Sequence, residues 1–401
     1  MENPKIRFKG YTKDWEQRKL GDMGSTFTGL SGKTKEDFGH GDAQFITYMN
    51  VFSNPVANLE MTEAVEIDAK QNRVKKGDVF FTTSSETPEE VGMSCVMPEN
   101  KDNIYLNSFC FGYRPTEKFD LDYLAYVLRA DSFRKEMKFL AQGISRYNIS
   151  KNKVMEVSIP IPNLEEQTMV GRYFSTLDHL ITLHQRKCEQ TKKLKKYMLQ
   201  KMFPQNGAKV PEIRFDGFTY DWEQRKLGEL GTVQTCKRIF KDQTSEKGDI
   251  PFFKNGTIGL EPDSYISREM YEEFRRLYPY PEVGDTLISV VGSIGRTAEY
   301  TGKDEYFQDS NVVWLKTDGS INKKFLKISY QVIKWLIEGS TVKHLYNDNI
   351  LRSEIVMPVS QIEQAKIAEF FEELDHLITL HQRKCDELKK MKKYMLQNMF
   401  I

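Results

Sequence analysis

The feature that most constrains this sequence is a segment that occurs twice. Residues 177–188 and residues 374–385 both read LDHLITLHQRKC. In and around both copies, apolar residues recur at steps of three and four, which is the period of an amphipathic α-helix. The surrounding stretch of about 40 residues predicts a rod of about 60 Å in each half of the chain. Because so long a helix must bury its apolar stripe, we expect the two helices to pair as an antiparallel coiled coil.

A second repeat precedes the first. Residues 4–24 read PKIRFKGYTKDWEQRKLGDMG, and residues 211–231 read PEIRFDGFTYDWEQRKLGELG. We call these the Trp segments. Each is followed by an insert of low mutual identity (roughly 25–160 and 232–356) and then by the long helix. Two equal halves in the same order predict an α+β protein with two mixed α/β domains related by a pseudo-twofold and separated by the helix pair.

The repeats also set the predicted boundaries. We expect a first domain at 1–162, a helix at 163–203, a linker at 204–210, a second domain at 211–358 and a second helix at 359–401. The second helix ends at Ile401, where the first helix leads on into a Trp segment. We therefore expect the two chain termini to lie close together.

The inserts contain short runs of β-branched and aromatic residues. They predict strands within 77–83, 104–115, 284–291 and 311–317, and the first and third runs begin with the same Gly-Asp pair. Longer amphipathic patterns predict one helix at 120–143 and another at 323–345.

Apolar spacing in the two long segments predicts the seam between the helices. The seam residues are Phe174, Leu177, Ile181, His184, Leu194, Met198, Phe371, Leu374, Ile378, His381, Leu388, Met391 and Met395. We interpret His184 and His381 as partly hydrated residues at the seam's edge. The alternative is that they set the register or contact a partner.

Composition excludes several classes. The formal net charge is only +1, which argues against a purely electrostatic nucleic-acid binder but not against a site-specific one. No run of apolar residues is long enough for a membrane span, and the first residues lack the apolar core of a signal peptide. Five scattered cysteines without a CxxC pair indicate reduced thiols in a cytoplasmic protein.

Catalytic motifs are absent from the sequence. It contains no Pro-Pro, so the [DN]-P-P-[YF] loop of adenine methyltransferases is missing, as are HExxH and GxSxG. Residues 27–34 (FTGLSGKT) end like a phosphate-binding loop, but Phe27 stands where its first glycine is required. We expect no catalytic residue, no metal and no cofactor on this chain.

Polar loops that follow the predicted strands recur at corresponding places in both inserts. Such loops carry the forked and planar side chains that read base edges in a DNA groove. In the first insert the candidates are Ser84, Ser85, Thr87, Arg146, Tyr147, Asn148, Lys151 and Lys153. In the second they are Lys254, Asn255, Ser293, Arg296, Lys343, Tyr346, Asn347, Asn349 and Arg352. The alternative is that these are ordinary surface loops rich in turn-forming residues.

The Trp segments, the Gly-Asp pairs, the exits at 162–167 and 358–364 and the duplicated helices together resemble the specificity (S) subunits of type I restriction–modification systems. The resemblance covers essentially the whole chain. It implies that each insert is a target recognition domain that reads one half of a split DNA sequence, while the helices set the spacer and dock two modification subunits.

The same resemblance implies the partners and the cofactors. Double-stranded DNA, two modification (adenine methyltransferase) subunits and restriction (translocase and nuclease) subunits are the expected partners. S-adenosylmethionine, ATP and Mg²⁺ are expected on those subunits, so this chain is not an enzyme on its own.

Two other functions remain open at this stage. One is a two-headed nucleic-acid-binding adaptor outside restriction, which would not co-purify with an adenine methyltransferase. The other is a nuclease or transferase acting alone, which would be active as the isolated chain. The sequence does not reveal which bases are read or how long the spacer is.

Overall fold

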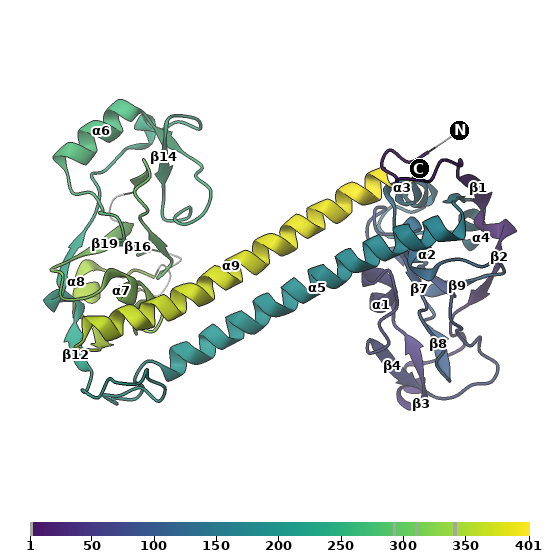
Figure 1. Ribbon diagram of the computed structural model, residues 1–401, viewed down its shortest axis with the longest axis horizontal. Coiled ribbons are helices and arrows are strands. Elements are labelled where there is room, and N and C mark those ends of the chain that lie inside the picture. The colour runs from purple at the N-terminus through teal and green to yellow at the C-terminus, as the bar shows by residue number, and fades with distance from the viewer. Residues whose placement is uncertain (1–2, 292–293, 309–310, 340–342) are drawn as a thin grey trace. The chain divides into compact units, whose positions relative to one another are not determined.

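The computed structural model describes residues 3–291, 294–308, 311–339 and 343–401 (Figure 1). Ser293, one of the predicted DNA-binding residues, lies outside the described residues. The chain forms two compact units: unit 1 is Met1–Gln185 with Gln382–Ile401, and unit 2 is Arg186–His381. Each unit therefore contains the end of a long helix that belongs, in sequence, to the other half of the chain.

The two predicted long helices are confirmed. They are α5 (Leu164–Lys201) and α9 (Gln361–Asn398), coloured teal and yellow in Figure 1. The helix α5 begins where the Asn163 side chain accepts a hydrogen bond from the Glu166 N–H at 2.9 Å, as an N-cap should.

Unit 1 is a mixed α/β domain. Its main sheet has the order β2-β9-β5-β7, a second sheet has the order β4-β3-β8, and β1 pairs with β11 beside the start of α5. The strands are β1 (Glu16–Lys19), β2 (Gly24–Thr28), β3 (Phe38–Ile46), β4 (Thr62–Val65), β5 (Val79–Thr82), β6 (Ser84–Ser85), β7 (Ser94–Val96), β8 (Ile104–Leu106), β9 (Cys110–Pro115), β10 (Tyr147–Asn148) and β11 (Ser158–Ile161). The helices are α1 (Tyr48–Ser53), α2 (Leu121–Val127), α3 (Asp131–Leu140) and α4 (Lys151–Met155), with 3₁₀ turns at Leu20–Asp22 and Lys35–Asp37.

Unit 2 repeats this plan. Its sheets have the orders β13-β19-β16-β17 and β15-β14-β18, and β12 pairs with β20. The strands are β12 (Glu223–Lys226), β13 (Gly231–Gln234), β14 (Ile250–Phe253), β15 (Tyr265–Ile266), β16 (Thr286–Ser289), β17 (Thr297–Glu299), β18 (Tyr306–Phe307), β19 (Val312–Thr317) and β20 (Glu354–Met357). The helices are α6 (Arg268–Leu277), α7 (Lys323–Ser329) and α8 (Asn347–Arg352), with 3₁₀ turns at Leu227–Glu229 and Lys241–Gln243.

The Gly-Asp pair that both inserts share has a structural cause. Gly77 and Gly284 have φ of 86° and 88°, a conformation that favours glycine. The buried carboxylates that follow, Asp78 and Asp285, accept backbone hydrogen bonds that close the turn before the strand. Each carboxylate also pairs at 2.7 Å with a cation of its own unit, Arg114 or Lys323.

Two predicted helices in the inserts are wrong in extent. The pattern at 120–143 is two helices, because Ala130 is extended between α2 and α3 while the Arg129 side chain turns inward to donate to four backbone carbonyls. In the pattern at 323–345, the helix α7 ends at Ser329, and the described residues between Ser329 and residue 345 are not helical. Beyond Ser329 come the β-branched pair Val332 and Ile333, which disfavour helix. The run at 104–115 forms two strands, β8 and β9, rather than one.

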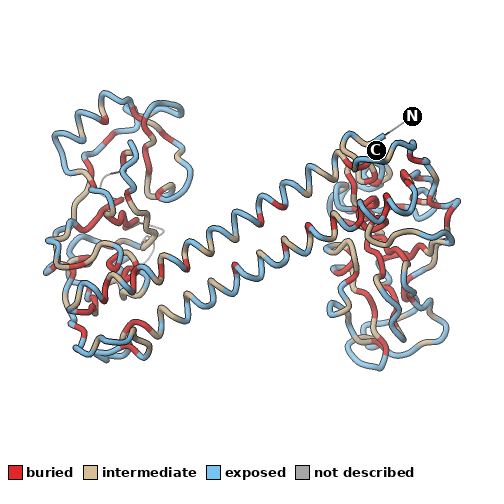
Figure 2. Tube along the Cα trace, viewed as in Figure 1, coloured by how far each residue is buried: buried red, intermediate tan, exposed pale blue. Residues whose placement is uncertain are grey.

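Within each unit the two long helices run antiparallel. In unit 1, Lys392 Nζ binds the Asp178 carboxylate at 2.5 and 2.7 Å, and in unit 2 the corresponding Lys195 Nζ binds Asp375 at 2.7 and 2.8 Å. Figure 2 shows the expected pattern, with single buried residues recurring between exposed ones along both helices.

Burial agrees with the predicted seam at most positions and disagrees at two. Phe174, Leu177, Ile181, Phe371, Leu374 and Leu388 are buried, and His184, His381, Ile378, Met198 and Met395 are half-buried. Leu194 and Met391 are each 46% exposed and do not belong to the seam. The heptad positions fall on the next residues, Lys195 and Lys392. Their aliphatic stems lie along the seam, and their ammonium groups pair with aspartates.

The Trp segments anchor each unit to its helices. Arg7 binds Glu166 of α5 through two hydrogen bonds of 2.6 and 2.9 Å, and Arg214 binds Glu363 of α9 in the same way at 2.7 and 2.9 Å. Trp222 also packs on Phe203, just beyond the end of α5, with ring centroids 5.9 Å apart. This shared docking explains why both motifs recur.

The predicted closeness of the chain's two end segments is confirmed within unit 1. The Ile6 N–H donates to the Asn398 carbonyl at 2.9 Å. In unit 2 the corresponding bond joins the Ile213 N–H to the Lys201 carbonyl, also at 2.9 Å. The contact is the same whether or not the chain is continuous there.

Candidate nucleic-acid interface

In unit 1 the structure brings the two predicted polar segments together. Strand β6 pairs antiparallel with β10, so that Ser85 lies opposite Tyr147 and Ser84 opposite Asn148. The Arg146 guanidinium donates to the Ser84 hydroxyl at 3.2 Å. Segments about 60 residues apart in sequence therefore form one polar surface.

The members of this set have different environments. Ser84 and Ser85 are only 5% and 7% exposed. The Ser84 carbonyl accepts from the Tyr48 hydroxyl at 2.7 Å, and the Ser85 hydroxyl donates to Glu90 at 3.2 Å. These serines thus support the loop from inside. The exposed members are Thr87, Arg146, Asn148, Lys151 and Lys153, and Tyr147 is half-buried.

In the part of the chain that the structure describes, no carboxylate forms an ion pair with the cations of this surface. Lys151 and Lys153 lie on the short helix α4, which directly follows β10. Among the described residues, neither of these lysines nor Arg146 takes part in an ion pair, whereas Arg7, Arg18 and Arg114 of unit 1 do. Unpaired cations on a polar loop suit contact with DNA phosphates or base edges.

Unit 2 builds the same framework with other side chains. The Leu345 N–H donates to the Val290 carbonyl at 2.9 Å, as the Ile149 N–H does to the Thr83 carbonyl at 3.0 Å in unit 1. Asn255 occupies the position of Tyr48, three residues beyond Phe252 as Tyr48 is beyond Phe45 in the equivalent parallel pairings. Its amide donates to the Val291 carbonyl at 2.5 Å, and its side-chain oxygen accepts from the Ser289 hydroxyl.

Of the other predicted residues of unit 2, some are bound by ion pairs or hydrogen bonds within the unit and others are exposed. Lys254 pairs with Asp263 at 3.1 Å, and Arg296 donates to the Gly256 carbonyl at 2.9 Å. Asn349 is buried and donates to Glu338 at 2.8 Å. The exposed members are Lys343, Tyr346, Asn347 and Arg352.

A cavity beside β6 and β10 involves residues that the sequence analysis missed. It has a volume of about 460 Å³, and its walls include Tyr48, Met49, Phe52, Phe109 and Glu90 as well as Arg146. The aromatic members come from α1 and from the turn before β9. Loop composition did not single them out, and only the fold brings them to the polar segments.

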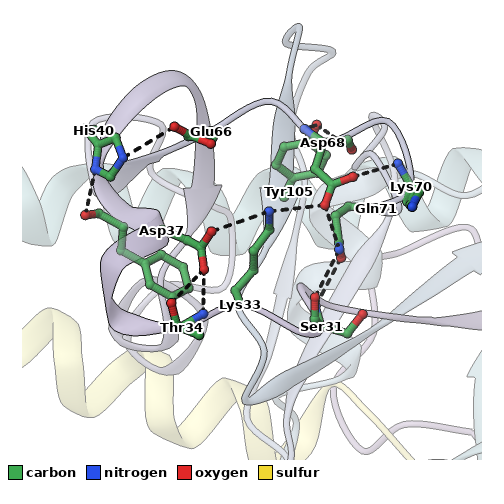
Figure 3. A network of polar contacts seen from close by, with 11 residues as sticks. Ser31, Lys33, Thr34, Asp37, His40, Glu66, Asp68, Lys70, Gln71 and Tyr105 are labelled. Carbon is green, nitrogen blue, oxygen red and sulfur yellow. Dashed lines mark hydrogen bonds and ion pairs between the residues drawn. The ribbon is translucent and has the colours of Figure 1, made fainter.

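The segment that resembles a phosphate loop has a different use (Figure 3). Lys33 Nζ lies 3.1 Å from Asp68 and 4.0 Å from Asp37. Hydrogen bonds from the Lys70 N–H and Gln71, and then the Lys33 ammonium, lower the pKa of Asp68 to about 2. Lys33 therefore neutralises carboxylates that fasten the loop against Tyr105, whose hydroxyl bonds the backbone of Asp68.

Metal sites and membrane-spanning helices are both absent from the part of the chain that the structure describes. No group of three or more His, Cys, Asp or Glu side chains in it is arranged to hold a metal ion. None of its helices combines the length and the apolar character that crossing a membrane requires. Burial raises the pKa of Cys95 to about 12, so this thiol stays protonated near neutral pH.

Comparison with known proteins identifies the family. A model of the type I restriction modification DNA specificity domain matches residues 12–193 and again residues 220–390. A putative type I restriction enzyme specificity subunit of Haemophilus influenzae is 38% identical over 267 residues, which cover 66% of this chain and 67% of the relative. The putative MjaX specificity subunit of Methanocaldococcus jannaschii is 25% identical over 414 residues, which cover 96% of this chain and 92% of the relative.

Solved structures agree in fold. The type I restriction-modification S subunit of M. genitalium matches with a TM-score of 0.65 at 15% identity, covering 100% of this chain and 99% of that one. A chain from a solved type I R-M system matches with a TM-score of 0.54 at 18% identity, covering 96% and 97%. With the domain model matched twice, the chain belongs to the type I restriction–modification DNA specificity family and is a DNA sequence-recognition subunit.

Proposed function

We propose that each unit reads one half of a bipartite double-stranded DNA target, and that the paired helices α5 and α9 set the spacer and dock two modification subunits. The observation that carries this proposal is one framework built twice with different side chains. The backbone contacts around β6 and around Val291 are equivalent, yet Tyr48 in one unit corresponds to Asn255 in the other. Two units that share a backbone framework but carry different loop side chains are suited to read two different half-sites.

Identity on the outer face of the helices supports two copies of one partner. Burial explains why seam residues such as Leu177 and Leu374 match. It does not explain why exposed residues also match between the copies. These are His179 and His376, Thr182 and Thr379, Leu183 and Leu380, Gln185 and Gln382, Arg186 and Arg383, and Lys187 and Lys384. A surface that is repeated without a structural need fits one kind of subunit bound twice.

Catalysis is assigned to the partners. The chain lacks the [DN]-P-P-[YF] loop of adenine methyltransferases, so base flipping and methyl transfer belong to the modification subunits, which hold S-adenosylmethionine. Restriction subunits supply ATP- and Mg²⁺-dependent translocation and cleavage. The assembly acts on cellular DNA, so we place it in the cytoplasm.

Methylation mapping tests the proposal. The chain is co-expressed with its modification subunit, and methylated adenines are located across the host genome. We expect one bipartite target with a methylated adenine in each half. Replacing residues 25–160 by the insert of another specificity subunit should change one half and leave the other half intact. A continuous target, or a change in both halves, would contradict the proposal.

A further inference from the structure

The cavity of unit 1 holds opposite charges that do not neutralise each other. Arg146, Glu86 and Glu90 all line it, yet among the described residues neither Arg146 nor Glu90 forms an ion pair. Each is instead tied to a buried serine, Arg146 to Ser84 at 3.2 Å and Glu90 to Ser85 at 3.2 Å. Because β6 pairs with β10, these two tethers are fixed relative to each other.

The wall behind the charges is partly aromatic and apolar. Tyr48 stacks on Phe52 with ring centroids 6.0 Å apart and an interplanar angle of 17°. Tyr48 lines the same cavity as Glu90 and Arg146, and burial raises the pKa of its hydroxyl. Met49 and Phe109, which are 54% and 58% exposed, form the rim.

A donor fork beside a carboxylate complements one base pair above others. In the major groove, guanine presents two acceptors, O6 and N7, and the paired cytosine presents the N4 donor. An arginine binds the two guanine acceptors together, and a glutamate accepts from cytosine N4. An A·T pair in the same place would put a donor against the arginine and an acceptor against the carboxylate.

We propose that Arg146 and Glu90 together read one G·C base pair in the half-site bound by unit 1. The proposal rests on the proposed function, since it concerns the residues by which unit 1 reads DNA. Ser84 and Ser85 position the two reading groups and do not touch the bases. Unit 2 has Asn255 and Val291 where unit 1 has Tyr48 and Ser84, so no equivalent reader is expected there.

The test measures binding of the complete complex of this chain with its modification subunits. Fluorescence anisotropy is recorded with the mapped target and with duplexes in which each base pair is replaced in turn. For the wild type, replacing one G·C pair of the first half-site should weaken binding about 10- to 100-fold. In Arg146→Lys and in Glu90→Ala this penalty should fall below about threefold at that pair alone.

Matched controls separate reading from charge. Arg146→Lys keeps the cation but loses the fork, so binding should persist while discrimination is lost. Glu89→Ala removes the neighbouring carboxylate, which binds Lys138 outside the cavity, and should leave every penalty unchanged. Lys151→Ala should weaken all duplexes by a similar factor. Thermal unfolding confirms that each variant is folded.

The outcomes are distinguishable. If no base pair of either half matters for the wild-type complex, the proposed function fails. If both half-sites are read but the penalties in the first half are the same in Arg146→Lys and Glu90→Ala as in the wild type, this inference alone is overturned. It is also overturned if the two variants relax different base pairs.

Discussion

At the scale of single residues, the two Arg–Glu pairs that fasten the Trp segments are nearly equal but not identical. Glu166 and Glu363 are almost fully buried, and each accepts both hydrogen bonds of an arginine fork. Glu363 also accepts from the Trp222 indole at 3.2 Å, whereas the Trp15 indole N–H is buried with no hydrogen-bond partner in the described structure. The sequence showed that both motifs recur. It did not show that they touch, because no local pattern links positions about 150 residues apart.

This asymmetry predicts unequal costs of substitution. Removing either carboxylate leaves a largely buried guanidinium unpaired, so Glu166→Ala and Glu363→Ala should each lower the free energy of unfolding of their unit by about 3–5 kcal/mol. Glu363→Ala should cost about 1 kcal/mol more, since it also removes the acceptor of Trp222. Urea denaturation of the two variants, with exposed Glu165→Ala as a control, measures the difference. Equal costs would mean that the indole bond contributes nothing.

At the scale of elements, a helix was predicted correctly where its apolar pattern was long and kept one period. The helices α5 and α9 were predictable because about ten turns repeat one pattern twice in the chain. The patterns at 120–143 and 323–345 each predicted a helix that was too long. An interruption of the helix, such as the one at Ala130, leaves the apolar spacing of the sequence intact. The polar loops that we propose to face DNA were predicted from composition. The cavity was not, because Tyr48 and Phe109 look like ordinary core residues until the fold places them.

The corrected seam gives a prediction that compares two leucines of the long helices. Leu388 is 5% exposed and packs in the core of unit 1, whereas Leu194 is 46% exposed. Leu388→Ala should therefore lower the free energy of unfolding by about 2–4 kcal/mol, while Leu194→Ala should change it by less than about 0.5 kcal/mol. Thermal and urea unfolding of both variants provides the measurement. A large loss at Leu194 would restore the register predicted from hydrophobicity alone.

At the scale of the whole molecule, each unit is completed by a helix end from the other half of the sequence. Unit 1 needs residues 382–401, and unit 2 needs residues that follow Gln185. Neither insert with its Trp segment alone contains a full core, because Phe400 packs against Trp15 and Phe174, and Phe203 packs against Trp222 and Phe371. The duplication was visible in the sequence. The exchange of helix ends between the halves was not visible in any local pattern. It could be inferred only from the expectation that the two long helices pair antiparallel.

The equivalence of the two junctions predicts that the chain tolerates circular permutation. Residues 204–210 join α5 to the second Trp segment, and Ile6 and Asn398 make the same contact in unit 1 without such a link. A permutant that starts at Ala208, ends at Gly207 and joins Ile401 to Met1 through about three added residues keeps the helix pairing and the cores of both units. The cut falls in an exposed turn at Asn206 and Gly207 and interrupts only the local hydrogen bond from the Ala208 N–H to the Gln205 carbonyl. We expect its melting temperature to lie within a few degrees of the original, since closing so short a link costs little. With the modification subunit it should direct methylation to the same bipartite target. A matched permutant opened inside α5 between Lys192 and Lys193 should lose stability, because it cuts the helix that unit 2 needs. If the first permutant folds but directs methylation to a different target, the two junctions are not equivalent.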